Sequence, residues 1–105
     1  MRNVIANAFS LNMLKDNCVL TCMQVDEETV KEYIKNGFYS VIGHQGTAEI
    51  LTAKLGFNIN YNRENYKKGN EDQIIVCLPS SRLNEGQILT KEELENFKIT
   101  YWLVK

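Results

Sequence analysis

The only histidine of the chain, His44, lies between two glycines in the segment GHQGTA, and a helical pattern begins directly after it. At a helix N-terminus, unpaired backbone N–H groups and the helix dipole favour an anion. Because imidazole exchanges protons near neutral pH, a histidine beside an anion site suits phosphate chemistry. A hydrogen-bonded structural role explains the same placement, and the neighbouring residues do not decide between the two.

Two further segments, 7–12 and 80–86, are richer in polar side chains than folding requires. Their polar and charged members include Asn7, Ser10, Asn12, Arg82 and Glu85. The first lies where a predicted strand ends and the second follows one directly, and ligands of open α/β sheets bind where strands end and helices begin. Turn formation explains the asparagines and the serine equally well. A surface ion pair between Arg82 and Glu85 is an equally ordinary interpretation.

Apolar and β-branched runs predict the strands that must position these segments. They cover residues 2–9, 18–25, 38–42, 73–79 and 97–104, and a further short strand is expected near 57–61. The run 73–79, QIIVCLP, is the most apolar and is expected at the centre of the sheet.

Three helices are expected between these strands, each with a recognisable start or stop signal. The first is capped by Asp26, runs to about Asn36 and stops at Gly37. Another runs from about Gln45 to Leu55 before Gly56, with Ala48, Leu51, Ala53 and Leu55 available for burial. The last covers 91–96 behind a capping box of Thr90 and Glu93. The order predicts the α/β (α+β) class, a mixed sheet of roughly five strands with flanking helices.

Size and charge limit the function classes. A chain of 105 residues accommodates one domain, 1–105. Its 12 basic and 13 acidic residues give a net charge of −1, which argues against coating duplex DNA or RNA through bulk positive potential. A small anionic ligand held by two or three arginines is compatible with this balance.

The cysteines indicate a reducing compartment. Cys18, Cys22 and Cys77 lie in apolar surroundings, where they are expected to pack as small core residues of a cytoplasmic protein. With a single histidine, no metal site is expected, and nothing in the sequence calls for a cofactor. No leader peptide or membrane-spanning run is apparent, so we expect a soluble protein without membrane association.

Four segments together resemble one family along nearly the whole chain and in the same order. They are NAFSLNML, SVIGHQGTAEILTAKLG, the pair Asn62-Arg63, and RLNEGQILTKEEL. The family is the ring nucleases of viruses and mobile elements, anti-CRISPR proteins that destroy the cyclic tetra-adenylate messenger of type III CRISPR defence. The GHxxTA and R-L-x-E-G segments are the specific parts of the resemblance.

The resemblance implies an architecture as well as an activity. It implies a five-stranded sheet with flanking helices, assembled as a symmetric homodimer with the ligand across the interface under a loop. A cyclic tetranucleotide has approximate two-fold symmetry, so two identical subunits can present the same groups to its halves. For a viral member, the location implied is the host cell cytoplasm.

The resemblance also assigns residues. The catalytic ones are His44, Arg82 and Glu85, and the ligand-binding ones are Asn7, Ser10, Asn12, Gly43, Thr47, Arg63 and Gly86. In the implied reaction a ribose 2′-OH attacks the adjacent phosphate without a metal, which leaves a linear product with a 2′,3′-cyclic phosphate. His44 would protonate the departing 5′-oxygen, and the arginines would hold phosphates. Glu85 could orient the 2′-OH, position Arg82 or bind an adenine edge.

Two other functions fit the same residues. One is a module that sequesters a cyclic oligoadenylate without cutting it. The other is a small mobile-element regulator that acts by binding a protein.

Overall fold

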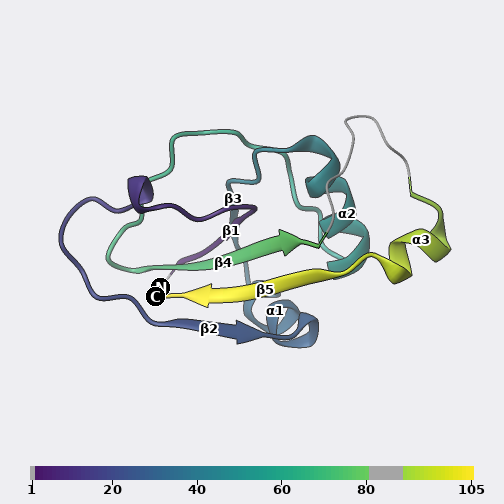
Figure 1. The fold of residues 1–105 in the computed structure, drawn as a ribbon, viewed down its shortest axis with the longest axis horizontal. Helices are drawn as coiled ribbons and strands as arrows, with labels where there is room; N and C mark the ends of the chain where they lie inside the picture. The colour runs from purple at the N-terminus through teal and green to yellow at the C-terminus, as the bar shows by residue number, and fades with distance from the viewer. Residues whose placement is uncertain (1, 81–88) are drawn as a thin grey trace.

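The computed structural model describes residues 2–80 and 89–105, which form a five-stranded mixed sheet and three α-helices (Figure 1). The strands are β1 (Arg2–Ala6), β2 (Cys22–Val25), β3 (Tyr39–Ser40), β4 (Asp72–Pro79) and β5 (Ile99–Val104). The helices are α1 (Glu27–Ile34), α2 (Gln45–Leu55) and α3 (Lys91–Asn96), with a short 3-10 helix at Leu11–Met13. The predicted fold class is confirmed.

The sheet places the carboxyl ends of three strands at one edge. Its order is β2-β5-β4-β1-β3, and β1 runs parallel to both β3 and β4. Strand β5 is antiparallel to β4 and to β2. The predicted central position of the apolar run 73–79 is confirmed, since β4 lies in the middle and Asp72 through Cys77 are buried. The polar segments after β1 and β3 therefore leave the sheet on the same side, where β4 also ends.

Alternation along the strands divides the core between the two faces of the sheet. On one face, Ile75 and Cys77 of β4 pack with buried side chains of α1 and α2, among them Val30 and Leu51. On the other face, side chains from loops and from the short 3-10 helix provide the cover instead of an α-helix. They include Phe9, Met13, Leu20 and Tyr66. The segment between β3 and α2 includes Ile42, which is buried in the core on the face covered by α1 and α2.

Local capping signals explain where the helices begin and end. The predicted bounds of α2 are confirmed, and Gly56 closes it at φ 78°, a left-handed conformation that glycine adopts without strain. Asp26 caps α1 by accepting a hydrogen bond from the Thr29 N–H at 2.9 Å. The capping box of Thr90 with Glu93 is present at α3. Helix α1 ends at Ile34, two residues before the predicted Asn36.

Several strand predictions were too long. The first strand ends at Ala6 instead of residue 9, and the third is limited to Tyr39–Ser40. Residues 18–21 lie outside β2, and the strand expected near 57–61 is reduced to one bridge between Ile42 and Tyr61. For β2 and β3 the physical reason is edge position, because a strand with one neighbour has half the ladder to hold its ends. Strand β1 has neighbours on both sides, and it ends where its pairing with β4 ends, at Ala6.

The prediction that all three cysteines are buried was wrong for two of them. Cys18 and Cys22 are exposed, because β2 is an edge strand and Cys18 precedes it in a loop. Cys77 is buried in the central strand, and burial raises the pKa of its thiol to about 12. Ala53, expected at the core, faces solvent because the buried stripe of α2 follows Ala48, Leu51 and Leu55.

Candidate functional site

A side-chain hydrogen bond connects the segments that follow β1 and β3. Asn7, the residue after β1, accepts a hydrogen bond at Oδ1 from the backbone N–H of Gly43, at 3.0 Å. The two residues are 36 positions apart in sequence. Two of the three polar segments singled out in the sequence therefore meet directly, at the edge of the sheet where strands β1 and β3 end.

Arg63 approaches the same point from a third segment. An ideal Cβ built on Gly43 would lie 3.5 Å from Arg63 Cγ and 3.9 Å from Asn7 Oδ1. The aliphatic stem of Arg63 therefore lies against the Gly43 backbone, and its side chain is largely in solvent. We refer to Asn7, Gly43, His44 and Arg63 as the strand-end cluster.

Asn62 holds Arg63 in this position. Its backbone N–H donates to the Ile42 carbonyl at 2.9 Å, and its Nδ2 donates to the Ser40 carbonyl at 2.8 Å. The same amide donates to Glu64 Oε1 at 2.7 Å, and the Tyr39 hydroxyl also donates to Glu64. These bonds fasten residues 62–64 along the edge of β3.

Sequence reasoning noted Asn62 only as half of the Asn-Arg pair and gave it no role. The available signal was an asparagine beside a candidate ligand arginine in an otherwise irregular loop. Asparagine side chains readily replace backbone hydrogen bonds in such loops.

His44 is the N-cap of α2. Its Nδ1 accepts a hydrogen bond from the Thr47 N–H at 3.2 Å, and the Thr47 Oγ1 lies 3.2 Å from the same nitrogen. The imidazole thus accepts from one of the unpaired N–H groups at the start of α2, which were expected from the sequence to be available to an anion. His44 is half-buried, and within residues 2–80 and 89–105 its Nε2 has no hydrogen-bond partner. Nε2 is therefore the ring nitrogen available to a ligand.

Thr47 lies behind His44 and is only 5% exposed. The resemblance implies that Thr47 binds the ligand. In the folded chain its N–H contacts the imidazole, and its hydroxyl lies at hydrogen-bonding distance from it.

The remaining predicted site residues are placed differently. Ser10 precedes the 3-10 helix and Asn12 lies within it, and both are exposed. The Asn12 carbonyl accepts a hydrogen bond from Lys67 Nζ. In the described part of the chain, no hydrogen bond links Ser10 or Asn12 to the strand-end cluster. Arg82, Glu85 and Gly86 lie outside the described residues.

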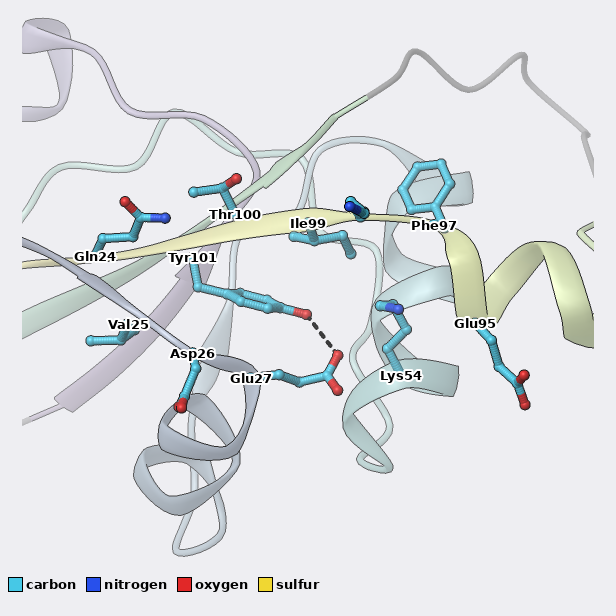
Figure 2. Close-up of a pocket in the computed structure, with 11 residues that line it drawn as sticks. Gln24, Val25, Asp26, Glu27, Lys54, Glu95, Phe97, Ile99, Thr100 and Tyr101 are labelled. Atoms are coloured by element: carbon cyan, nitrogen blue, oxygen red, sulfur yellow. Dashed lines mark hydrogen bonds between the residues drawn. The ribbon is translucent and has the colours of Figure 1, made fainter.

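A separate pocket of about 760 Å³ lies between the start of α1, the end of α2, and β5 (Figure 2). The Tyr101 hydroxyl donates to Glu27 Oε1 at 3.2 Å across it. Burial, together with the nearby charge of Glu27, raises the pKa of Tyr101, so this phenol stays a hydrogen-bond donor. The pocket is lined by both acidic and basic side chains. These are Asp26, Glu27, Lys54, Glu95 and Lys98. Among residues 2–80 and 89–105, no predicted site residue lines this pocket.

Two further observations concern membrane spanning and metal binding. Among residues 2–80 and 89–105, no helix has the length and apolar character to cross a membrane. In the same ranges, no three histidine, cysteine or acidic side chains gather as metal ligands.

The chain resembles proteins from an archaeal virus and a bacterium. It is 32% identical over 87 residues to Uncharacterized protein 26 of Sulfolobus islandicus filamentous virus (isolate Iceland/Hveragerdi), covering 81% of this chain and 74% of that protein. It is 31% identical over 80 residues to Uncharacterized protein YddF of Bacillus subtilis (strain 168), covering 73% of this chain and 74% of that protein.

A solved structure and a family model agree with these relatives. The structure of B116 of Sulfolobus turreted icosahedral virus (STIV) superposes with a TM-score of 0.86 at 27% identity, covering 99% of this chain and 98% of that one. The model of the STIV B116-like family matches residues 3–103, which include the whole strand-end cluster. The chain therefore belongs to the STIV B116-like family.

Proposed function

We propose that the protein is a metal-independent ring nuclease that converts cyclic tetra-adenylate to linear products ending in a 2′,3′-cyclic phosphate. The observation that carries the proposal is the strand-end cluster. It combines an arginine, an asparagine and a half-buried histidine at one edge of the sheet, and the Nε2 of that histidine has no partner among the described residues. The resemblance of the NAFSLN, GHQGTA and RLNEG segments to ring nucleases supports the choice of a cyclic RNA.

The proposed reaction needs little from the protein beyond positioning and one proton. The nucleophile is the 2′-OH of the substrate itself, so the enzyme has to align it with the phosphate and the departing 5′-oxygen. His44 Nε2 faces away from α2 and donates a proton to that oxygen. General acid catalysis of this kind contributes about 10²- to 10⁴-fold.

Charge on the phosphate is met by arginine. Arg63 projects from the loop that Asn62 fastens to β3, and its guanidinium presents a fork of donors that matches phosphate oxygens. Arg82 and Glu85 complete the proposed catalytic set, from the segment that follows β4 in sequence. Two protomers related by a two-fold axis would each supply such a set to opposite halves of the ring.

The decisive experiment incubates cyclic tetra-, penta- and hexa-adenylate with the protein in EDTA and separates the products by chromatography. We expect cleavage of the tetra-adenylate ring to a product with a 2′,3′-cyclic phosphate. His44→Ala should lose most of the rate, by about 10²-fold or more.

His44→Asn is the matched variant, because asparagine is among the best N-cap residues and lacks an imidazole. It should be as inactive as His44→Ala. It should also keep the thermal stability of the wild-type protein, whereas His44→Ala loses about 1 kcal/mol of cap energy. An active His44→Asn variant would reduce His44 to a structural cap.

The other outcomes identify the alternatives. If the wild-type protein cuts no cyclic oligoadenylate, the enzymatic proposal is wrong. Tight binding of an unchanged ring would instead identify a sequestering module. Absence of binding, together with capture of one protein partner, would identify a regulator that acts by protein contact.

A further inference from the structure

One residue supplies both groups that face Nδ1 of His44. The Thr47 N–H lies 3.2 Å from Nδ1, and the Thr47 hydroxyl oxygen lies 3.2 Å from the same atom. Thr47 is 5% exposed, so these groups face the imidazole from inside the protein. The ring is therefore held through Nδ1, which leaves Nε2 on its opposite side.

The two groups suit different protonation states of the ring. A backbone N–H can only donate, so it pairs with Nδ1 when that nitrogen carries a lone pair. A hydroxyl can donate or accept, so it can pair with Nδ1 whether or not that nitrogen carries a proton. When the ring is neutral with its proton on Nε2, both Thr47 groups can donate to Nδ1. When the ring is charged, the N–H loses its acceptor and the hydroxyl oxygen can accept from Nδ1–H.

We propose that Thr47 is the positioning residue that keeps His44 in place through the proton transfer, a role that rests on the proposed ring nuclease function. In the step, the bond between the 2′-oxygen and phosphorus forms and the bond between phosphorus and the 5′-oxygen breaks. The 2′-hydroxyl proton passes to water, and the Nε2 proton of the imidazolium passes to the leaving 5′-oxygen. Directly after the transfer the ring is neutral with its proton on Nδ1, where the Thr47 oxygen accepts it, and exchange with water then restores the resting form with its proton on Nε2.

This role differs from the ligand contact that the resemblance implies for Thr47. The side chain acts through His44 and needs no contact with the nucleotide. Thr47→Val tests the distinction, because valine keeps the β-branched shape and removes only the hydroxyl. Thr47→Ser is the matched control, because serine keeps the hydroxyl.

The first test is spectroscopic and needs no turnover. His44 is the single histidine, so an ¹⁵N spectrum of the protein contains one pair of imidazole nitrogens. In the neutral ring we expect Nδ1 without a proton and Nε2 with one. In the charged ring we expect an observable Nδ1 proton in wild type and Thr47→Ser, lost to exchange with water in Thr47→Val. A neutral ring protonated on Nδ1, or an Nδ1 proton unaffected by Thr47→Val, would overturn the assignment.

The second test is kinetic. Thr47→Val should lower kcat for cyclic tetra-adenylate about tenfold or more with ligand affinity within about twofold of wild type, and Thr47→Ser should stay within about twofold on both. A ring with sulfur in place of the bridging 5′-oxygen has a leaving group that needs no proton. On that substrate Thr47→Val should match wild type, whereas a misfolded or misaligned variant would stay slow and contradict the proposal.

The two proposals fail separately. Wild-type protein that cleaves no ring defeats the ring nuclease proposal, and the spectroscopic test still decides the contact between Thr47 and His44. Wild-type protein that cleaves, with a Thr47→Val variant of unchanged kcat, defeats the positioning role alone.

Discussion

Under the proposed function, His44 combines a structural role as a helix cap with a chemical role as a proton donor. Its Nδ1 completes the first turn of α2, and its Nε2 is left for a ligand at the end of β3. The cap fixes the direction of the ring, and a fixed ring is what a proton donor requires. At the scale of one residue, local helix capping therefore supplies the positioning that a catalytic role needs.

At the opposite end of the sheet, Asp72 at the start of β4 is the centre of a hydrogen-bond network. Its carboxylate accepts hydrogen bonds from Arg2 Nε and Nη2 at 3.1 and 3.0 Å, from the Tyr66 hydroxyl at 2.5 Å and from the Gly69 N–H at 2.9 Å. Burial by itself raises the pKa of Asp72, but the donors, with Arg2 first, hold it well below its usual range. Burial and the bond to Asp72 also raise the pKa of Tyr66.

This depressed pKa predicts acid sensitivity. A carboxyl whose pKa is lower in the folded state stabilises the protein fully above its unfolded pKa, and that stability is lost as the pH falls toward the folded value. Asp72→Asn should therefore lower the free energy of unfolding by about 1–3 kcal/mol at neutral pH. The deficit should shrink below about pH 4.

Urea unfolding at about pH 7, 5 and 3 measures this difference. Asp16→Asn is the control, because Asp16 is an exposed carboxylate bonded only to the adjacent Asn17 N–H in the described part of the chain. It should show little change at any of these values. A deficit for Asp72→Asn that is independent of pH would mean that the ionised carboxylate is not the stabilising form.

At the scale of elements, α2 is the part that connects fold and site. Its N-terminus carries His44, and its middle buries Ala48 and Leu51 against the sheet. Its C-terminus closes on Gly56 in the left-handed region. Under the proposed function, the N-terminus of α2 serves the site, and its C-terminus serves the fold.

Substitution at Gly56 tests whether the C-terminus of α2 can be changed without an effect on His44 at its N-terminus. An added Cβ would meet nothing within 4 Å, so the cost of Gly56→Ala is conformational and amounts to about 1 kcal/mol of stability. Gly56→Asn should cost less, because asparagine tolerates the left-handed region. Thermal unfolding measures both. The cleavage rate at a permissive temperature should stay at the wild-type level, and a large rate loss would show that the far end of α2 is coupled to His44.

At the scale of the whole molecule, one chain provides a single strand-end cluster at one edge of the sheet, whereas a cyclic tetranucleotide offers two equivalent halves. The symmetric homodimer that we propose resolves the difference, since a two-fold axis repeats the same groups. The net charge of −1 is consistent with placed arginines binding a compact ligand.

The dimer predicts a binding stoichiometry. Titration calorimetry with cyclic tetra-adenylate and the uncut His44→Asn variant should give one ring for two chains, and sedimentation should give twice the mass of one chain. One ring bound per chain, on a protein that sediments as a monomer, would contradict the shared site and leave each protomer as a complete binding unit.

The amino-acid sequence by itself determined the features that depend on neighbours along the chain. The bounds of α2, the caps by Asp26 and Thr90, and the apolar run that became β4 were all predictable, because caps, glycine stops and apolar runs act within a few residues. The position of His44 at a helix N-terminus followed from the same local signals.

Only the tertiary structure decided which distant residues meet. Asn7 bonds to Gly43, Arg63 lies against that glycine, and Asn62 is fastened to β3, all through pairing between strands that the linear pattern does not specify. Strand order also exposed Cys22, because the residues of an edge strand lack the cover that apolar sequence alone suggests, and Cys18 is exposed in the loop before that strand. Local interactions set the elements of this protein, and the register of its sheet assembles the site.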